Sequence, residues 1–440
     1  MYRFTQLVAY AVICVAVLTA PETVHADTTG QKTTSPGEAF SLQDALLRID
    51  DSPALKAAEK SVEAAEGDLD QAGLWPNPEL AIEVENFAGK DDREGFDGAE
   101  TTVAIAQQLE LGGKRSARKS IAFHGIILAE WDKRALEQDL RLDTMKAFYA
   151  VLAAQMRLEQ AKQLANLAEQ AYQTVADRVE AGKISPVQQL RASVELNSSR
   201  SALETAERQL VQSRQDLCAK WGDTKPDFET VVGNFDELFD LPDWEALQAS
   251  FHGNPDVQRW EAELASKNAS LELERASSIP DVTLSFGVRK YEETGNNAYV
   301  AGLEFPLPLF DRNQGGRKSA QAEISRAVFA RNATVARLAS DLQSAFQGFL
   351  ATRYQARTLQ HDILPAAEQA NEAAQIGFQE GKFDFLEALD AQRTLFEVKA
   401  QYIDAISAYH ETRLNMLRLA GQIDQIQPFK IGNEETHEYQ

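Results

Sequence analysis

The chain has 440 residues, with 67 acidic against 44 basic side chains, a formal net charge of −23 and two cysteines. This acidic balance argues against a nucleic-acid partner and against an anionic membrane surface, because both carry negative charge themselves. Two cysteines are too few for a disulfide framework or for a thiolate metal cluster.

The first segment of the chain predicts an export signal. Arg3 precedes an apolar stretch from Leu7 to Leu18, and Val24-His25-Ala26 has the small-x-small spacing that signal peptidase reads. We therefore expect residues 1–26 to be removed on export. The apolar stretch is too short to cross a bilayer as a helix, which needs about 20 residues, and no later segment is long enough. Any membrane crossing must therefore use strands.

An internal repeat of about 200 residues organises the rest of the chain. Three pairs of markers recur at offsets of 202, 203 and 199 residues: Ser52-Pro53 with Asn254-Pro255, Gly112-Gly113-Lys114-Arg115 with Gly315-Gly316-Arg317-Lys318, and Ala181-Gly182-Lys183 with Glu380-Gly381-Lys382. The pattern predicts a first unit over 27–221, a linker over 222–243, a second unit over 244–421 and a polar tail over 422–440.

Each unit is expected to carry two β-strands after a short helix. The strands of the first unit lie at about 79–87 and 100–111, and those of the second at about 281–291 and 297–309. Apolar and polar residues alternate along all four, and each strand is long enough to cross hydrocarbon at a tilt. A soluble antiparallel sheet with one wet face shows the same alternation. The export signal and the strand count favour the membrane.

Four strands cannot close into a barrel by themselves. An open sheet edge cannot face lipid, because its amides would have no partner there, so closure must join several chains. Two chains would give eight strands with a filled interior, and three would give twelve strands with room for a lumen. The residues alone do not choose between these oligomers. The predicted fold class is mainly α with a transmembrane β-barrel part.

Long helices are predicted after each strand pair. The run from Lys114 to Ala181 has no proline, its apolar residues recur at steps of three and four, and about 68 helical residues span roughly 100 Å. A tip at about 182–186 turns the chain into a returning helix. The second unit repeats this plan up to a tip at about 381–385, except that Pro365 should kink or locally break its long helix. We expect a sheath of paired helices beyond the strands.

Three specific sequence runs carry a family resemblance: Gln71-Ala72-Gly73-Leu74-Trp75-Pro76-Asn77-Pro78, Gln108-Leu109-Glu110-Leu111-Gly112-Gly113-Lys114-Arg115 and Phe305-Pro306-Leu307-Pro308-Leu309-Phe310-Asp311. Over its mature length the chain resembles TolC-type outer membrane efflux proteins, and these runs resemble the CzcC-like heavy-metal branch. The resemblance implies a homotrimer in outer membrane lipid with a twelve-stranded barrel and a periplasmic helical barrel. It also implies a periplasmic adaptor (membrane fusion) protein, an inner-membrane pump of the resistance-nodulation-division class, and export of cobalt, zinc or cadmium.

Three groups of candidate site residues follow. Glu387 and Asp390 are three apart and share a helix face, and by the resemblance they form stacked acidic rings at a periplasmic gate. The adaptor-docking tips comprise Gly182, Lys183, Ser185, Gly381, Lys382 and Phe383. Acids expected to face the lumen and favour cations are Glu83, Glu85, Glu110 and Glu304. A solvated helix face, an ordinary helix turn and a wet sheet face are the competing interpretations of the three groups. Phe383 stands where drug-efflux relatives carry a basic residue, so their closing salt bridges are not expected.

The sequence predicts no enzyme, no cofactor and no metal centre. No Gly-rich phosphate loop precedes a helix, no nucleophile is flanked by a recognisable base, and the histidines have no pair at ligand spacing. Two other functions stay open at this point. One is a duct of the same architecture for drugs or secreted polypeptides. The other is a soluble periplasmic coiled-coil scaffold or adaptor, a class that lacks four strands of membrane-crossing length.

Overall fold

The computed structural model describes residues 40–90, 95–380, 382–383 and 385–425, all within one compact unit. The predicted export signal, residues 1–26, and most of the predicted tail lie outside the described residues. The tip residue Gly381 lies outside them as well.

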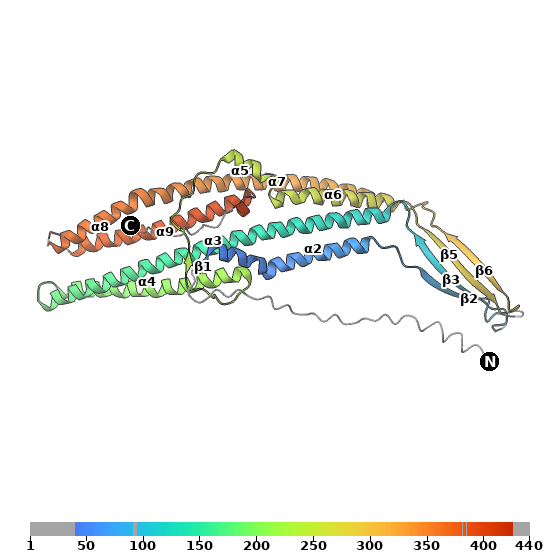
Figure 1. The fold of residues 1–440 in the computed structure, drawn as a ribbon, viewed down its shortest axis with the longest axis horizontal. Helices are drawn as coiled ribbons and strands as arrows, with labels where there is room; N and C mark the ends of the chain where they lie inside the picture. The colour runs from blue at the N-terminus through green and yellow to red at the C-terminus, as the bar shows by residue number, and fades with distance from the viewer. Residues whose placement is uncertain (1–39, 91–94, 381, 384, 426–440) are drawn as a thin grey trace, which may run out of the picture. The chain divides into compact units, whose positions relative to one another are not determined.

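The same order of elements occurs twice along the described chain. The first series is α2 (Pro53–Ala72), β2 (Glu79–Glu85), β3 (Glu100–Leu109), α3 (Lys114–Glu180) and α4 (Pro186–Cys218). The second series is α6 (Pro255–Ala276), β5 (Val282–Tyr291), β6 (Asn297–Glu304), α7 (Gln314–Thr358), α8 (Leu364–Gln379) and α9 (Phe385–Leu419). Figure 1 shows the four strands together at one end of α2, α3, α6 and α7.

The two short helices α2 and α6 begin in the same way. Ser52 precedes Pro53, and its hydroxyl accepts a hydrogen bond from the Leu55 amide at 3.2 Å. Asn254 precedes Pro255, and its side-chain oxygen accepts from the Asp256 amide at 2.8 Å. A polar N-cap satisfies an orphan amide, and proline suits the first helical position because its missing donor is not needed there. The repeated Ser-Pro and Asn-Pro pairs are therefore helix starts.

Just before Pro365 the regular α-helix of the second unit is interrupted, as the sequence predicts, but the chain stays helical. A π-helical turn, η4 (Leu359–Ile363), joins α7 to α8. Proline lacks an amide donor and its ring clashes with the carbonyl of the preceding turn, and a widened turn relieves both problems. The first unit has no proline in this stretch, and α3 runs through 67 residues without interruption.

The four long strands form one antiparallel sheet in the order β2-β3-β5-β6. The central pair, β3 with β5, joins the two halves of the chain. β6 ends at Glu304, short of the predicted 309, because β5 begins at Val282 and Pro306 and Pro308 follow. β2 ends at Glu85, where Asn86 takes a left-handed conformation with φ 57°.

The segment between the two units is packed, although the sequence predicts only a linker there. Its strand β4 (Val231–Val232) pairs in parallel with β1 (Phe40–Ser41). Phe228 and Phe235 are buried in what we call the central core, a cluster whose largest fully buried members include Phe40, Phe148, Phe349, Ile406 and Tyr409. Short helical elements complete the chain: α1 (Leu42–Leu47), η1 (Arg48–Asp51), η3 (Ala219–Trp221), α5 (Trp244–Phe251) and η5 (Ile423–Gln425).

Hydrogen bonds tie this segment to α9. The Phe239 amide donates to the Tyr409 hydroxyl at 2.8 Å, and the Tyr402 hydroxyl donates to Asp236 at 2.8 Å. His410 Nε2 lies 2.8 Å from the carbonyl oxygen of Phe235. Because these bonds join residues more than 150 positions apart, they fix the segment to the returning helix of the second hairpin.

Candidate channel-forming sheet and helical tips

One face of the sheet is apolar and exposed. Leu80 faces Ile105, Ile82 faces Val103, and Leu284 faces Leu303 across neighbouring strands. Most large apolar side chains on this face are exposed, for example 39% at Val84, 66% at Ile82 and 81% at Tyr299. Contiguous apolar surface of this kind is rare on proteins that face only water, and marks a membrane or protein contact.

Three of the four acids expected in the lumen share the opposite, polar face of the sheet. Glu83 faces Thr102, Glu304 faces Thr283, and Glu85 faces Glu100. Arg289 reaches across from β5 and lies 3.1 Å from Glu85 and 3.0 Å from Glu100. One guanidinium therefore offsets only part of the charge on the two carboxylates. Glu83 and Glu304 have no ion pair within the part of the chain that the structure describes.

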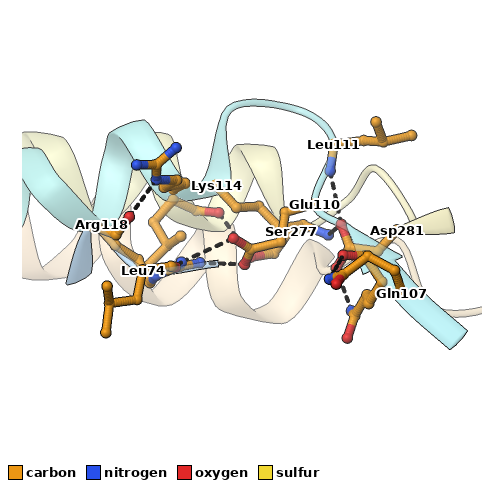
Figure 2. A network of polar contacts seen from close by, with 12 residues as sticks. Leu74, Gln107, Glu110, Leu111, Lys114, Arg118, Ser277 and Asp281 are labelled. Atoms are coloured by element: carbon orange, nitrogen blue, oxygen red, sulfur yellow. Dashed lines mark hydrogen bonds and ion pairs between the residues drawn. The ribbon is translucent and has the colours of Figure 1, made fainter. Parts of the chain in front are cut away.

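Glu110, the fourth of these acids, lies beyond the sheet. β3 ends at Leu109, and the turn through Gly112 and Gly113 brings α3 back so that Arg118 forms a bidentate ion pair with Glu110 (Figure 2). The Glu110 side chain is 10% exposed. Its carboxylate thus binds Arg118 at the junction of strand and helix. The alternation of apolar and polar side chains along β3 ends before Glu110.

Asp281 organises this junction, and sequence reasoning missed it. It immediately precedes β5 and accepts hydrogen bonds from Gln108 Nε2 at 3.0 Å, from the Leu111 amide at 2.9 Å and from Lys114 Nζ at 2.6 Å (Figure 2). Burial raises the pKa of Asp281, but the bonds from Lys114 and Leu111 outweigh it, so that the pKa lies below its usual value.

Gly112 is required at the same junction. Its φ is +74°, and a Cβ there would lie 2.9 Å from the carbonyl oxygen of Ala276. Only glycine combines that backbone conformation with so close an approach. The repeated Gly-Gly pair therefore marks the turn in the sequence, whereas no repeated motif marks Asp281.

The first helical tip has regular capping. Gly182 has φ +67°, its amide donates to the Val179 carbonyl, and the Lys183 amide donates to the Arg178 carbonyl at 2.9 Å. This is the Schellman pattern that closes a helix with a left-handed glycine. Ser185 then caps α4 by accepting from the Val187 amide at 3.3 Å. The predicted tip residues Gly182, Lys183 and Ser185 thus make one tight turn.

The second tip has a different structure. The amides of Lys382 and Phe383 both donate to the carbonyl of Gly377, at 2.8 and 3.1 Å, and Lys382 pairs with Glu380 at 2.5 Å. A Cβ on Gly377 would collide with the Phe383 ring, so this glycine makes room for it. The last turns of α3 and α8, just before the tips, are in contact, because the Arg178 guanidinium lies 4.9 Å from the ring centre of Phe378.

The predicted gate residues lie in the first turns of α9. Glu387 and Asp390 are both exposed, and Asp390 lines an open groove of about 960 Å³ between α9 and the hairpin of α3 and α4. Arg157 and Arg393 line the same groove, so both acidic and basic side chains surround Asp390. The acids of the sheet belong to another part of the chain, and the structure does not bring them together with this pair.

No helix among the described residues is both long and apolar enough to span a membrane. The same residues contain no group of three or more histidine, cysteine, aspartate or glutamate side chains placed to hold a metal ion.

The profile of a known family, described as outer membrane efflux protein, matches residues 42–223 and 246–422 of the chain. The chain belongs to this family. Members are trimeric outer membrane channels that work with an adaptor and an inner-membrane pump, and are not enzymes. The protein is accordingly a component of the outer membrane.

Individual proteins are similar over much of the chain. The cobalt-zinc-cadmium resistance protein CzcC of Cupriavidus metallidurans is 37% identical over 84% of this chain and 86% of its own length. The nickel-cobalt-cadmium resistance protein NccC of Alcaligenes xylosoxydans is 26% identical over 68% and 66%. Among solved structures, a membrane protein from Pseudomonas aeruginosa is 18% identical, covers 89% of this chain and 99% of its own, and has a TM-score of 0.74, which shows the shared fold.

Proposed function

We propose that this protein is the outer membrane duct through which a three-part efflux system releases heavy-metal cations of the cobalt, zinc and cadmium kind. The observation that supports this choice of cargo is the 37% identity, over 84% of the chain, to a cobalt-zinc-cadmium resistance protein. The polar sheet face with Glu83 and Glu304, together with the net charge of −23, supports the passage of cations rather than anions.

The proposed assembly has three copies, which together supply twelve strands with the apolar face toward lipid and the polar face toward a lumen. An adaptor docks on the two tips, at Gly182, Lys183 and Ser185 and at Gly381, Lys382 and Phe383. A pump of the resistance-nodulation-division class in the inner membrane selects the cargo.

Deletion of the gene tests the cargo. Tolerance to cobalt, zinc and cadmium should fall, tolerance to a panel of drugs should stay, and a plasmid copy should restore the loss. Sensitivity to drugs without sensitivity to cations would replace this proposal by a drug duct. Recovery of the protein in the soluble periplasmic fraction would replace it by a scaffold or adaptor.

Within this duct we assign the periplasmic gate to Glu387 and Asp390. Both side chains are exposed, they are three residues apart on α9, and they lie beside the second tip. In three copies they make six carboxylates around one axis, which concentrate multivalent cations in a narrow throat. Phe383 itself contributes no charge at this tip.

Sided block in planar bilayers tests the gate. The double variant Glu387→Ala with Asp390→Ala should lose most of the block by trivalent cations added on the periplasmic side. The matched control, Glu83→Ala with Glu304→Ala, should reduce cation selectivity but keep the sided block. Unchanged block in the first variant would show that the constriction lies elsewhere.

A further inference from the structure

Each outer strand of the sheet has an edge that no described strand of the same chain covers. The order β2-β3-β5-β6 leaves β2 and β6 at the two ends. Unpaired edge amides find no partner in lipid and attract another chain. We propose that β2 of one copy pairs with β6 of the next in one defined register, with Val84 opposite Phe305 and Ile82 opposite Leu307. This inference rests on the proposed assembly of three copies and specifies how its seams are built.

The register comes from the internal repeat. In the two hairpins Ile82 faces Val103 and Leu284 faces Leu303, so β2 corresponds to β5 at an offset of 202 residues and β3 to β6 at an offset of 200. The chain already contains one junction between its halves, where Ile105 faces Phe286. Adding 200 to the number of Ile105 gives its counterpart Phe305 in β6, and subtracting 202 from the number of Phe286 gives its counterpart Val84 in β2 of the next copy. In the same way, the pair of Gln107 and Leu284 corresponds to a pair of Leu307 with Ile82 of the next copy.

The direction of the backbone groups gives an independent check on β6. In an antiparallel pair, successive residues point their N–H and C=O groups to opposite sides. The Tyr291 amide donates to the Asn296 carbonyl at 3.0 Å, so the backbone groups of odd-numbered β5 residues point toward β6. By the register, the backbone groups of even-numbered β6 residues point toward β5. Odd-numbered residues of β6 therefore point to its free edge.

The other edge follows from the second printed bond of this kind. The Glu292 amide donates to the Ala99 carbonyl at 2.9 Å, which makes even-numbered residues of β5 and odd-numbered residues of β3 mutual partners. Even-numbered residues of β3 then point to β2, and even-numbered residues of β2 point outward. Val84 and Phe305 thus both point to the free edges, and both belong to the apolar face, as the repeat requires.

The prolines after β6 fit the same register. Pro306 and Pro308 are even-numbered, so their missing donors are on the β5 side, at a level that lies beyond Val282, the first residue of β5. Phe305 and Leu307 keep their outward amides, and their side chains are 51% and 66% exposed in the single chain. The Leu309 amide donates a hydrogen bond back to the Leu307 carbonyl at 2.8 Å, so the edge that can pair with another strand ends there. A second copy therefore extends β6 beyond Glu304 to Leu307.

On the polar face the same register sets Glu304 of one copy opposite Glu85 of the next. Two carboxylates directly opposite each other destabilise a sheet unless a cation offsets them. Arg289 already lies 3.1 Å from Glu85 and 3.0 Å from Glu100, so its single positive charge offsets part of the charge on Glu85 within its own chain. By the alternation above, this is a pair without backbone hydrogen bonds, the closer kind, with a Cα separation of about 4.5 Å.

That close pair makes the register testable by crosslinking. A Cα separation of about 4.5 Å lies within the range of a disulfide, whereas diagonal neighbours at about 7–8 Å lie outside it. We expect the double variant Glu85→Cys with Glu304→Cys, in a Cys218→Ala background, to form covalent trimers on oxidation. The control Glu83→Cys with Glu304→Cys shifts the pair by two residues and should give about tenfold less. Arg289 keeps its second partner, Glu100, at 3.0 Å in both variants.

Native electrophoresis of the same samples separates the two levels of the proposal. Native trimers that crosslink through Glu83→Cys with Glu304→Cys, or through neither pair, would overturn the register and leave the assembly standing. Monomers in both double variants and in the Cys218→Ala background would overturn the assembly itself. Covalent trimers that form only with Glu85→Cys and Glu304→Cys support both.

Discussion

The central core and the four-stranded sheet treat large side chains in opposite ways. In the core, Tyr409, Ile406 and Phe148 are at most 1% exposed in a single copy of the chain. In the sheet, Leu80, Phe286 and Leu303 are more than 60% exposed. One copy therefore completes its core alone, while the sheet is completed only by lipid and by further copies.

This difference separates folding from assembly along one chain. The core is closed by contacts between residues of both halves, such as the Tyr409 hydroxyl with the Phe239 amide. The sheet has backbone pairing between the halves, but within the described part of the chain no second layer covers its apolar face. Substitutions in the two regions should therefore fail in different ways, and the next predictions use that to test the comparison.

The largest effect is expected on the apolar face of the sheet. Leu284→Arg places a charge toward lipid, which costs about 2–4 kcal/mol in each copy at mid-bilayer, so the yield of detergent-resistant trimer should collapse. Helix content by circular dichroism should stay near wild type, because the core is untouched. The matched control is the neighbouring Thr283→Arg, which enters the polar face opposite Glu304 and should assemble. An equal loss of trimer in both variants would contradict the assignment of one face of the sheet to lipid and the other to water.

Much of the sheet and of the helix starts could be predicted because the signals are local. Alternation along Leu80, Ile82 and Val84 sets one face of β2 whatever it pairs with, and Ser52-Pro53 caps a helix through its own next turn. Glu83, Glu85 and Glu304 were assigned to one face on this basis, and they do share it. The placement of that face toward a lumen stays a proposal.

The parts that could not be predicted depend on distant residues or on irregular backbone. Glu110 continues the alternation of β3 in the sequence, but the strand ends one residue earlier and Arg118 binds the carboxylate. The pairing of β1 with β4 involves two residues in each strand, too few for any periodic signal. The π-helical turn before Pro365 is one of several ways a helix can accommodate proline, and the sequence does not choose among them.

A smaller effect is expected in the central core at acid pH. His410 is 1% exposed, its ring stacks on Tyr149 at 3.9 Å between centres, and its Nε2 faces the Phe235 carbonyl. Its buried Nδ1 has no hydrogen-bond partner among the residues that the structure describes. Burial is the main cause that lowers the pKa of His410 to about 4; the bond to the Phe235 carbonyl opposes the shift, and the nearby Arg413 adds to it. The imidazole is therefore neutral in the folded protein at neutral pH.

The sign of the pH dependence follows from that shift. The unfolded chain takes up this proton below about pH 6.5 while the folded protein resists it until about pH 4, so stability falls across this window by roughly 2–3 kcal/mol. Denaturant unfolding by circular dichroism should show the fall in wild type and a flatter profile in His410→Gln. The exposed His252→Gln should keep the wild-type slope. A wild-type slope in His410→Gln would mean that other groups set the acid sensitivity of the core.

The smallest effect on stability, and the most local, is expected at the first tip, which belongs to neither region. Gly182 has φ +67° and nothing within 4 Å of a Cβ built on it, so Gly182→Val adds backbone strain of about 1–2 kcal/mol and no collision. The strain should open the turn and weaken adaptor docking by about tenfold, since 1.4 kcal/mol corresponds to that factor. Core stability and trimer yield should stay, because both depend on residues outside this turn. Gly67→Val in α2 is the control, as Gly67 also has open space around it but no positive φ. Site-specific crosslinking to the adaptor measures docking, and an unchanged yield in Gly182→Val with intact trimers would show that the adaptor binds elsewhere.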